Sequence, residues 1–206
     1  MAPKYWQDPK GRATIIKIIK ELVPEWDEGL HMWQLDLVVR ILDSEDVLCC
    51  TATGDGKSAL FAAPIIVLQE MARNPGLYPD LPYRSHPVGL IVTPTKGLSA
   101  NIVSFHDCRR FVFLIIWLAF KVKELKSLRV PALAYCKETV TEARKAGRKL
   151  VVEIKECKRW SIVCIDPKHL RDAEWREITE WPIFRRNVVF GCVDEAFRHP
   201  PTGPRH

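Results

Sequence analysis

Apolar positions along this chain fall into short continuous runs and longer amphipathic stretches. The continuous runs predict buried strands at 47–50, 88–93, 131–135, 160–165 and 187–193. Apolar residues at helical spacing predict a helix at 14–23, a second is predicted at 29–42, and a third, at 58–72, is predicted to follow a glycine-containing loop. Two further helices are predicted at 139–158 and 167–181, and the proline-rich segment 74–87 is predicted to be an irregular loop. Strands that alternate with helices favour a parallel sheet, and right-handed crossovers would place helices on both of its faces.

A glycine-bracketed loop follows the first predicted strand and reads Thr53-Gly54-Asp55-Gly56-Lys57-Ser58. Its two glycines allow consecutive backbone amides to point at phosphate oxygens, close to the start of a helix. In such a loop Lys57 would reach the terminal phosphates and Ser58 would bind Mg²⁺. An ordinary strand-to-helix turn remains the alternative, because Thr51 stands where the usual pattern begins with glycine.

Two carboxylates, Asp194 and Glu195, directly follow the last predicted strand. Ligands of parallel sheets bind at the carboxyl ends of the strands, so Asp194 could hold Mg²⁺ through water while Glu195 orients an attacking water. Without the glycine-bracketed loop, these acids would be interpreted as solvated carboxylates at the end of a strand. Combined with the loop, they predict an α/β fold of the P-loop NTPase type, a three-layer sandwich with a mostly parallel sheet and helices on both faces.

Composition narrows the class of protein. The chain has 206 residues, 47% of them apolar, which suits one globular domain, and its net charge of +6 favours polyanionic partners. Seven cysteines without Cys-x-x-Cys spacing, and a polar start, predict an intracellular protein of a reducing compartment without a membrane segment.

Five ordered elements carry a resemblance to a known family: Trp33-Gln34, the loop at 53–58, Thr93-Pro94-Thr95-Lys96-Gly97-Leu98, Asp166-Pro167-Lys168-His169-Leu170 and Val193-Asp194-Glu195-Ala196. Together they resemble the first motor domain, RecA-like in fold, of RecQ-like DEAD/DEAH-box helicases of superfamily two, in their fungal forms. The resemblance covers residues 26–197. It leaves a helical extension at 1–25 and a disordered tail at 198–206.

The resemblance implies ATP and Mg²⁺ as cofactors and nucleic acid as partner, with DNA favoured over RNA and the nucleus as the favoured location. The residues it implies are Lys57 and Glu195 for catalysis; Gln34, Thr53, Gly54, Asp55, Gly56, Lys57 and Ser58 for the nucleotide; Ser58 and Asp194 for the metal; and Thr95 and Lys96 for nucleic acid.

Several of these residues have structural alternatives. Gln34 would read the adenine edge of ATP, but a solvated helix glutamine is an equal alternative, and Trp33 is more typical of a core position. Residues 93–98 could form a simple turn. Asp166 stands where relatives have serine or threonine; it suits a helix cap better than a phosphate contact.

A basic cluster, Arg144, Lys145, Arg148 and Lys149, is predicted on one helix and could touch nucleic acid. A solvated face that pairs Glu142 and Glu153 with neighbouring cations is favoured over that role.

Two departures from the resemblance shape the expected activity. Residues 104–123 interrupt the expected spacing and are predicted to be an insertion, with a genuine buried helix as the alternative. The chain also closes in a proline-rich tail where relatives continue into a second motor domain, so no arginine finger would complete the site. We therefore expect Mg-ATP binding without unwinding. A non-helicase P-loop NTPase and an inactive fragment of a helicase gene remain as alternative functions.

Overall fold

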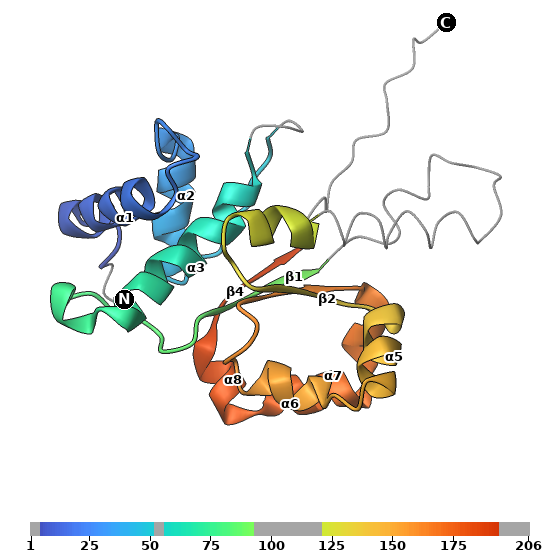
Figure 1. Cartoon of the computed structure of the whole chain (residues 1–206). Helices are drawn as coiled ribbons and strands as arrows, with labels where there is room; N and C mark the ends of the chain where they lie inside the picture. Colours follow the sequence, from blue (N-terminus) through green and yellow to red (C-terminus); the bar gives the residue numbers. More distant parts are fainter. Residues whose placement is uncertain (1–4, 52–55, 93–120, 194–206) are drawn as a thin grey trace, which may run out of the picture.

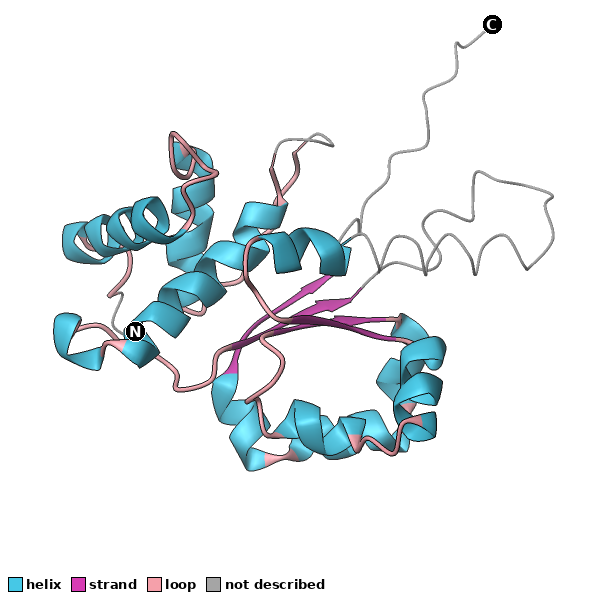
Figure 2. Cartoon of the chain, viewed as in Figure 1, coloured by secondary structure: helices cyan, strands magenta, loops and turns pink. Residues whose placement is uncertain are grey.

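The structure of the chain, a computed structural model, describes residues 5–51, 56–92 and 121–193. Four parallel strands form one sheet in the order β2-β3-β1-β4. Their bounds are β1 Val88–Val92, β2 Ala132–Tyr135, β3 Ile162–Ile165 and β4 Val188–Val193. In the centre, Ile91 of β1 lies beside Cys164 on one side and Cys192 on the other. All of these pairings are parallel, and the strands are drawn in magenta in Figure 2, which agrees with the predicted α/β class.

Helices cover both faces of this sheet (Figure 1). One face carries α1 Pro9–Leu22, α2 Met32–Leu42, α3 Ser58–Arg73 and the helical residues 121–127. The other carries α5 Lys137–Lys145, α6 Leu150–Lys155, α7 Ala173–Glu180 and α8 Pro182–Asn187. Two short 3-10 helices, η1 Pro75–Leu77 and η2 Pro167–Arg171, lie in connecting segments. The helices thus form the outer layers of the predicted sandwich.

Alternation along the strands divides the buried side chains between two cores. In β3, Ile162 and Cys164 belong to the core under α1, α2 and α3, which we call the first core, whereas Val163 and Ile165 belong to the second core, under α5 to α8. Successive strand residues point to opposite faces, so a strand whose four residues are all buried must be covered on both sides. The continuous apolar runs of the sequence follow from this arrangement.

Helix α1 and the residues before it pack in the same core as α2 and α3. Helix α1 starts at Pro9, earlier than the predicted residue 14, because proline fits the first turn of a helix. Three of its isoleucines, Ile15, Ile18 and Ile19, are buried in the first core. Before the helix, the Trp6 side chain is 1% exposed, and the backbone N–H groups of Trp6 and Gln7 donate to the two carboxylate oxygens of Asp43, at 3.1 and 3.2 Å.

Both predicted crossover helices prove to be broken. The helix predicted at 139–158 ends at Lys145 and resumes at Leu150, because Gly147 adopts φ +66°, a conformation that ends a right-handed helix. The helix predicted at 167–181 divides into η2 and α7, with α8 beginning directly afterwards at Pro182. The prediction of single helices was therefore wrong in both places, although the segments do connect strands across the second face.

The predicted strand at 47–50 was also wrong, since these residues form no helix or strand. The Leu48 side chain is 74% exposed, while Cys49 packs partly against the first core. Among the strands that the structure describes, β4 pairs with β1 alone. An apolar run becomes a strand only where a neighbour accepts its backbone hydrogen bonds, and the run 47–50 joins no ladder.

No helix within the described ranges is long and apolar enough to cross a lipid bilayer. The proline-rich segment 74–87 contains one short turn, η1, and is otherwise irregular. The insertion predicted at 104–123 lies outside the described residues except for its last three positions, which continue into the helical residues 124–127. The tail at 198–206 lies wholly outside them.

Candidate nucleotide-binding site

The amino end of α3 lies on the side of the sheet where the strands end (Figure 1). Phe61, in the first turn of α3, stacks on Phe190 of β4, with ring centroids 6.4 Å apart and planes 30° apart. The Phe190 ring lies over Gly89 of β1, where a Cβ atom would come within 2.3 Å of it. This packing fixes the start of α3 to β4, three residues before the end of that strand.

Gly56 makes the turn that leads into α3. Its φ is +76°, a left-handed conformation that costs other residues roughly 1–2 kcal/mol. A Cβ atom at this position would also lie 2.8 Å from the side-chain nitrogen of Gln34. The carbonyl of Gly56 then accepts a hydrogen bond from the backbone N–H of Ala59, at 3.0 Å, which closes the first turn of the helix. Glycine is therefore favoured here chiefly by conformation, and a larger residue would also displace the amide of Gln34.

Lys57 folds back across the loop. Its Nζ donates a hydrogen bond to the backbone carbonyl of Thr51, 3.0 Å away, so the two ends of the loop are joined. The Thr51 hydroxyl oxygen is buried and has no hydrogen-bond partner among the described residues. A cation and an unsatisfied hydroxyl therefore lie at the two ends of the segment 52–55. Both groups suit an anion, because a phosphate oxygen can accept from each of them.

Gln34 links α2 to the loop. Its side-chain nitrogen donates to the carbonyl of Gly56 at 3.1 Å, and its side-chain oxygen accepts from the backbone N–H of His31 at 2.9 Å. The residue is 4% exposed, so the alternative of a solvated helix glutamine was wrong. Gln34 thereby ties the amino end of α2 to the turn at Gly56. Its neighbour Trp33 packs partly against the first core, as expected of a core tryptophan.

Ser58 is the first residue of α3 and presents its hydroxyl at the helix start. The hydroxyl oxygen accepts a hydrogen bond from Nζ of Lys121, 3.0 Å away. The same ammonium lies 3.5 Å from a carboxylate oxygen of Glu124 and 5.8 Å from the centroid of the Phe61 ring. No motif or spacing in the sequence pointed to Lys121, which falls in the predicted insertion.

Other predicted site residues lie outside the described residues: Thr53, Gly54, Asp55, Thr95, Lys96, Asp194 and Glu195. Their roles stay predictions. The strands that precede Thr95 and Lys96 and the two acids do end at one edge, because β1 and β4 are parallel neighbours with Val92 beside Val193. Asp166 is the cap that was expected: its carboxylate accepts from the backbone N–H of Lys168 at 3.0 Å, at the start of η2.

The residues that are described fit a nucleoside triphosphate with Mg²⁺. A left-handed glycine, a lysine that spans the loop and a serine at the start of a sixteen-residue helix provide amides, a cation and a hydroxyl oxygen in consecutive positions. Phosphate oxygens are bound by such amides and by the positive end of the helix dipole. A serine hydroxyl is one of the hard oxygen ligands that Mg²⁺ requires, the others coming from phosphates and water. No group of three or more metal-ligating side chains occurs within the described ranges.

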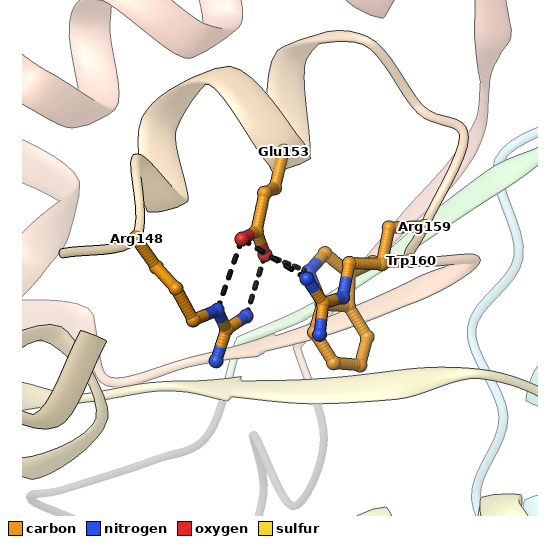
Figure 3. Close-up of polar contacts among 4 residues, drawn as sticks. All are labelled: Arg148, Glu153, Arg159 and Trp160. Carbon is orange, nitrogen blue, oxygen red and sulfur yellow. Dashed lines mark hydrogen bonds and ion pairs between the residues drawn. The ribbon is translucent and has the colours of Figure 1, made fainter. Parts of the chain in front are cut away.

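The basic cluster is not on one helix, because α5 ends at Lys145 and Arg148 lies in the turn before α6. Arg148 donates two hydrogen bonds to the carboxylate of Glu153, at 3.0 and 2.5 Å (Figure 3). Glu153 also accepts from Arg159 at 3.1 Å and from the indole N–H of Trp160 at 3.3 Å. The expected pairing of Glu153 with neighbouring cations is confirmed. These cations therefore stabilise the turn between α5 and α6.

Replacing Glu153 with glutamine is expected to lower the free energy of unfolding at pH 7 by about 1–2 kcal/mol. The hydrogen bonds from Arg148, supported by Trp160 and Arg159, hold the pKa of Glu153 below its ordinary value of 4.5, against the opposing effect of burial. A lowered pKa stabilises the fold above the unfolded pKa, and this contribution is lost as the pH falls through the folded pKa.

Urea denaturation of parent and variant should therefore show a gap that narrows below pH 4.5. The control is Glu156→Gln, whose side chain is 47% exposed and lies 3.9 Å from Lys158, with little expected change. A gap between parent and Glu153→Gln that is independent of pH would contradict the prediction.

A parallel α/β sheet with a glycine turn, lysine and serine leading into the helix beside its carboxyl edge defines a phosphate-loop nucleotide-binding domain. The family model of the DEAD/DEAH box helicases matches residues 32–196, and the chain belongs to this family. It is also similar to the pre-mRNA-processing ATP-dependent RNA helicase PRP5 of Kluyveromyces lactis, with 33% identity over 69 residues. That similarity covers 34% of this chain and 8% of the yeast protein's length.

Proposed function

We propose that the chain is the first motor domain of a RecQ-like helicase, which binds Mg-ATP and nucleic acid but does not unwind a duplex by itself. The observation that carries the proposal is the cradle of Gly56, Lys57 and Ser58 at the start of α3, fixed by Gln34 and placed beside the end of β4. The family of the chain supports the same activity.

In this proposal, Lys57 leaves the Thr51 carbonyl and contacts the terminal phosphates, which offer a charged acceptor in place of a neutral one. Ser58 and Asp194 hold the metal, Ser58 directly and Asp194 through water. Glu195 orients the attacking water, and Gln34 exchanges its hydrogen bonds with His31 and Gly56 for the adenine edge. When bound, Mg²⁺ neutralises charge on the phosphates.

Nucleic acid would lie across the same carboxyl edge, with Thr95 and Lys96 contacting backbone phosphates. The RecQ-like set of motifs favours DNA, whereas the Kluyveromyces lactis relative is named an RNA helicase. The similarity to that relative is confined to 34% of the chain, whereas the RecQ-like motifs extend along most of it. DNA is therefore retained in the proposal, and RNA binding is the competing outcome. A non-helicase NTPase is disfavoured by the family match, which spans both the loop and the acids.

Titration of the purified protein with a fluorescent ATP analogue and Mg²⁺ tests the proposal. Replacing Lys57 with alanine is expected to weaken binding about tenfold, since a charge-assisted hydrogen bond is lost. Asp194→Asn should weaken binding only when Mg²⁺ is present. The matched control is Lys126→Ala, which removes an exposed lysine from the helical residues 121–127 and should change nothing.

Equal affinities for parent and Lys57→Ala would overturn nucleotide binding at this loop and favour an inactive fragment. A second titration, with single strands of DNA and RNA of identical sequence, tests the partner. Tighter RNA binding would overturn the RecQ-like assignment and leave the motor domain standing. ATP-driven strand displacement by the isolated protein would overturn the expected lack of unwinding.

A further inference from the structure

Lys121 lies at the metal side of the nucleotide site. Its ammonium donates to the Ser58 hydroxyl at 3.0 Å, and its side chain is only 14% exposed. The Phe61 ring, in the first turn of α3, flanks it at 5.8 Å from centroid to Nζ. A lysine that is largely buried against a hydroxyl and an aromatic ring is in a defined position, unlike a lysine that extends into solvent.

The Ser58 hydroxyl oxygen cannot accept a hydrogen bond from this ammonium and bind Mg²⁺ with good geometry at the same time. Mg²⁺ binds oxygen at about 2.0–2.1 Å and demands near-octahedral geometry, with little tolerance for a second cation on the same oxygen. Two positive charges a few ångströms apart also repel each other strongly in a partly buried site. Metal binding at Ser58 therefore requires the ammonium of Lys121 to move.

Glu124 supplies the place to which it can move. One of its carboxylate oxygens, Oε2, is 3.5 Å from Lys121 Nζ, beyond a good hydrogen bond. This oxygen is buried and has no hydrogen-bond partner among the residues that the structure describes. A small rotation of the flexible lysine side chain would exchange the Ser58 hydroxyl for this carboxylate and would satisfy it.

We propose that Lys121 is a further residue of the nucleotide site. Its ammonium occupies the position beside Ser58 when Mg²⁺ is absent, and it moves to Glu124 when Mg²⁺ binds. The proposal rests on the proposed function, because it requires a nucleotide at the loop. Without metal, the Lys121 ammonium faces the phosphates and supports binding through a charge-assisted contact. With metal, it contributes no contact to the phosphates and opposes the second cation.

The test compares the affinity for a fluorescent ATP analogue in EDTA with the affinity in Mg²⁺, for the parent and for Lys121→Met. Methionine keeps the length of the side chain and removes its charge. We expect the affinity in EDTA to fall roughly tenfold and the affinity in Mg²⁺ to stay equal or rise, so that the ratio of the two increases at least tenfold. The matched control is Lys123→Met, which removes an exposed lysine two positions along the same helix and should leave both affinities unchanged.

A ratio that stays the same in Lys121→Met, or an equal loss in EDTA and in Mg²⁺, would overturn the proposal. Thermal unfolding followed by circular dichroism checks that the variant is folded. Lys121→Gln, which keeps one donor for Ser58 but no charge, provides a second variant with the same expected direction. If the parent itself binds no nucleotide, the proposed function fails. If the parent binds and Lys57→Ala does not, while Lys121→Met behaves as the parent, only the role of Lys121 fails.

Discussion

Replacing Gly56 with alanine is expected to weaken Mg-ATP binding roughly 30- to 100-fold. Alanine would be strained at φ +76°, and its methyl group would lie 2.8 Å from the side-chain nitrogen that Gln34 uses to contact residue 56. The loop would relax to another conformation to avoid both costs. Nucleotide binding would then have to restore the original turn, so the penalty appears as lost affinity.

Two further variants separate strain from collision in this prediction, again by titration with the fluorescent analogue. Gly147 also has a left-handed backbone, at φ +66°, but it lies far from the loop along the chain, and an added Cβ would have nothing within 4 Å. Gly147→Ala should therefore leave the nucleotide affinity unchanged. In a double-mutant cycle, Gln34→Ala should relieve part of the penalty of Gly56→Ala, because the colliding atom is removed. Strictly additive effects would show that the contact between Gln34 and the turn contributes nothing.

Replacing Gly11 with alanine is expected to destabilise the domain by about 2 kcal/mol, although alanine is the better helix former. A Cβ on Gly11 would lie 2.5 to 2.8 Å from backbone atoms of Tyr5 and Trp6. Backbone atoms cannot move aside as a side chain can, so the segment before α1 would detach. Trp6, now 1% exposed, would then lose its place in the first core.

Thermal unfolding measures this effect, and the expected loss corresponds to a midpoint lower by roughly 4–8 °C for a domain of this size. Gly76→Ala is the matched control, because Gly76 lies in η1 with nothing within 4 Å of an added Cβ. A second check is the difference in tryptophan fluorescence between each protein and its Trp6→Phe counterpart, which isolates one of the seven tryptophans and should report a more solvated indole in Gly11→Ala. A rise in the unfolding midpoint, as helix propensity alone predicts, would contradict the packing argument.

The pattern of the sequence predicted the four strands of the sheet. The runs at 88–93, 131–135, 160–165 and 187–193 became β1 to β4 within a residue or two. Burial on both faces explains the continuous apolar run of β3, whereas the residues of β4 are half-buried or exposed. The loop residues Gly56, Lys57 and Ser58 were recognised from spacing alone, since glycine before lysine and serine has a specific backbone use. The helix that begins at Ser58 was placed from the same motif.

What the sequence missed depends on partners that lie far along the chain. The residues around 47–50 do not show that this run lacks a strand to pair with. The residues around Gln34 likewise do not show that its side-chain amide donates to the carbonyl of Gly56. The contact between Lys121 and Ser58 joins two segments that no spacing rule relates. Gly147, in contrast, stood in the sequence within the long predicted helix 139–158, and a single glycine there was a readable sign of a break.

The strand order also bears on how the polypeptide emerges from the ribosome. Gly89, in the central strand, pairs with Ile162 on one side and with Phe190 on the other, and both partners are synthesised long afterwards. During translation, β1 and the apolar helix α3 are therefore synthesised before the strands that pair with β1. Parallel sheets with such distant pairings form slowly and leave hydrophobic surface exposed in the nascent chain. Chaperones that bind such surface should engage this protein until the final strand has been made.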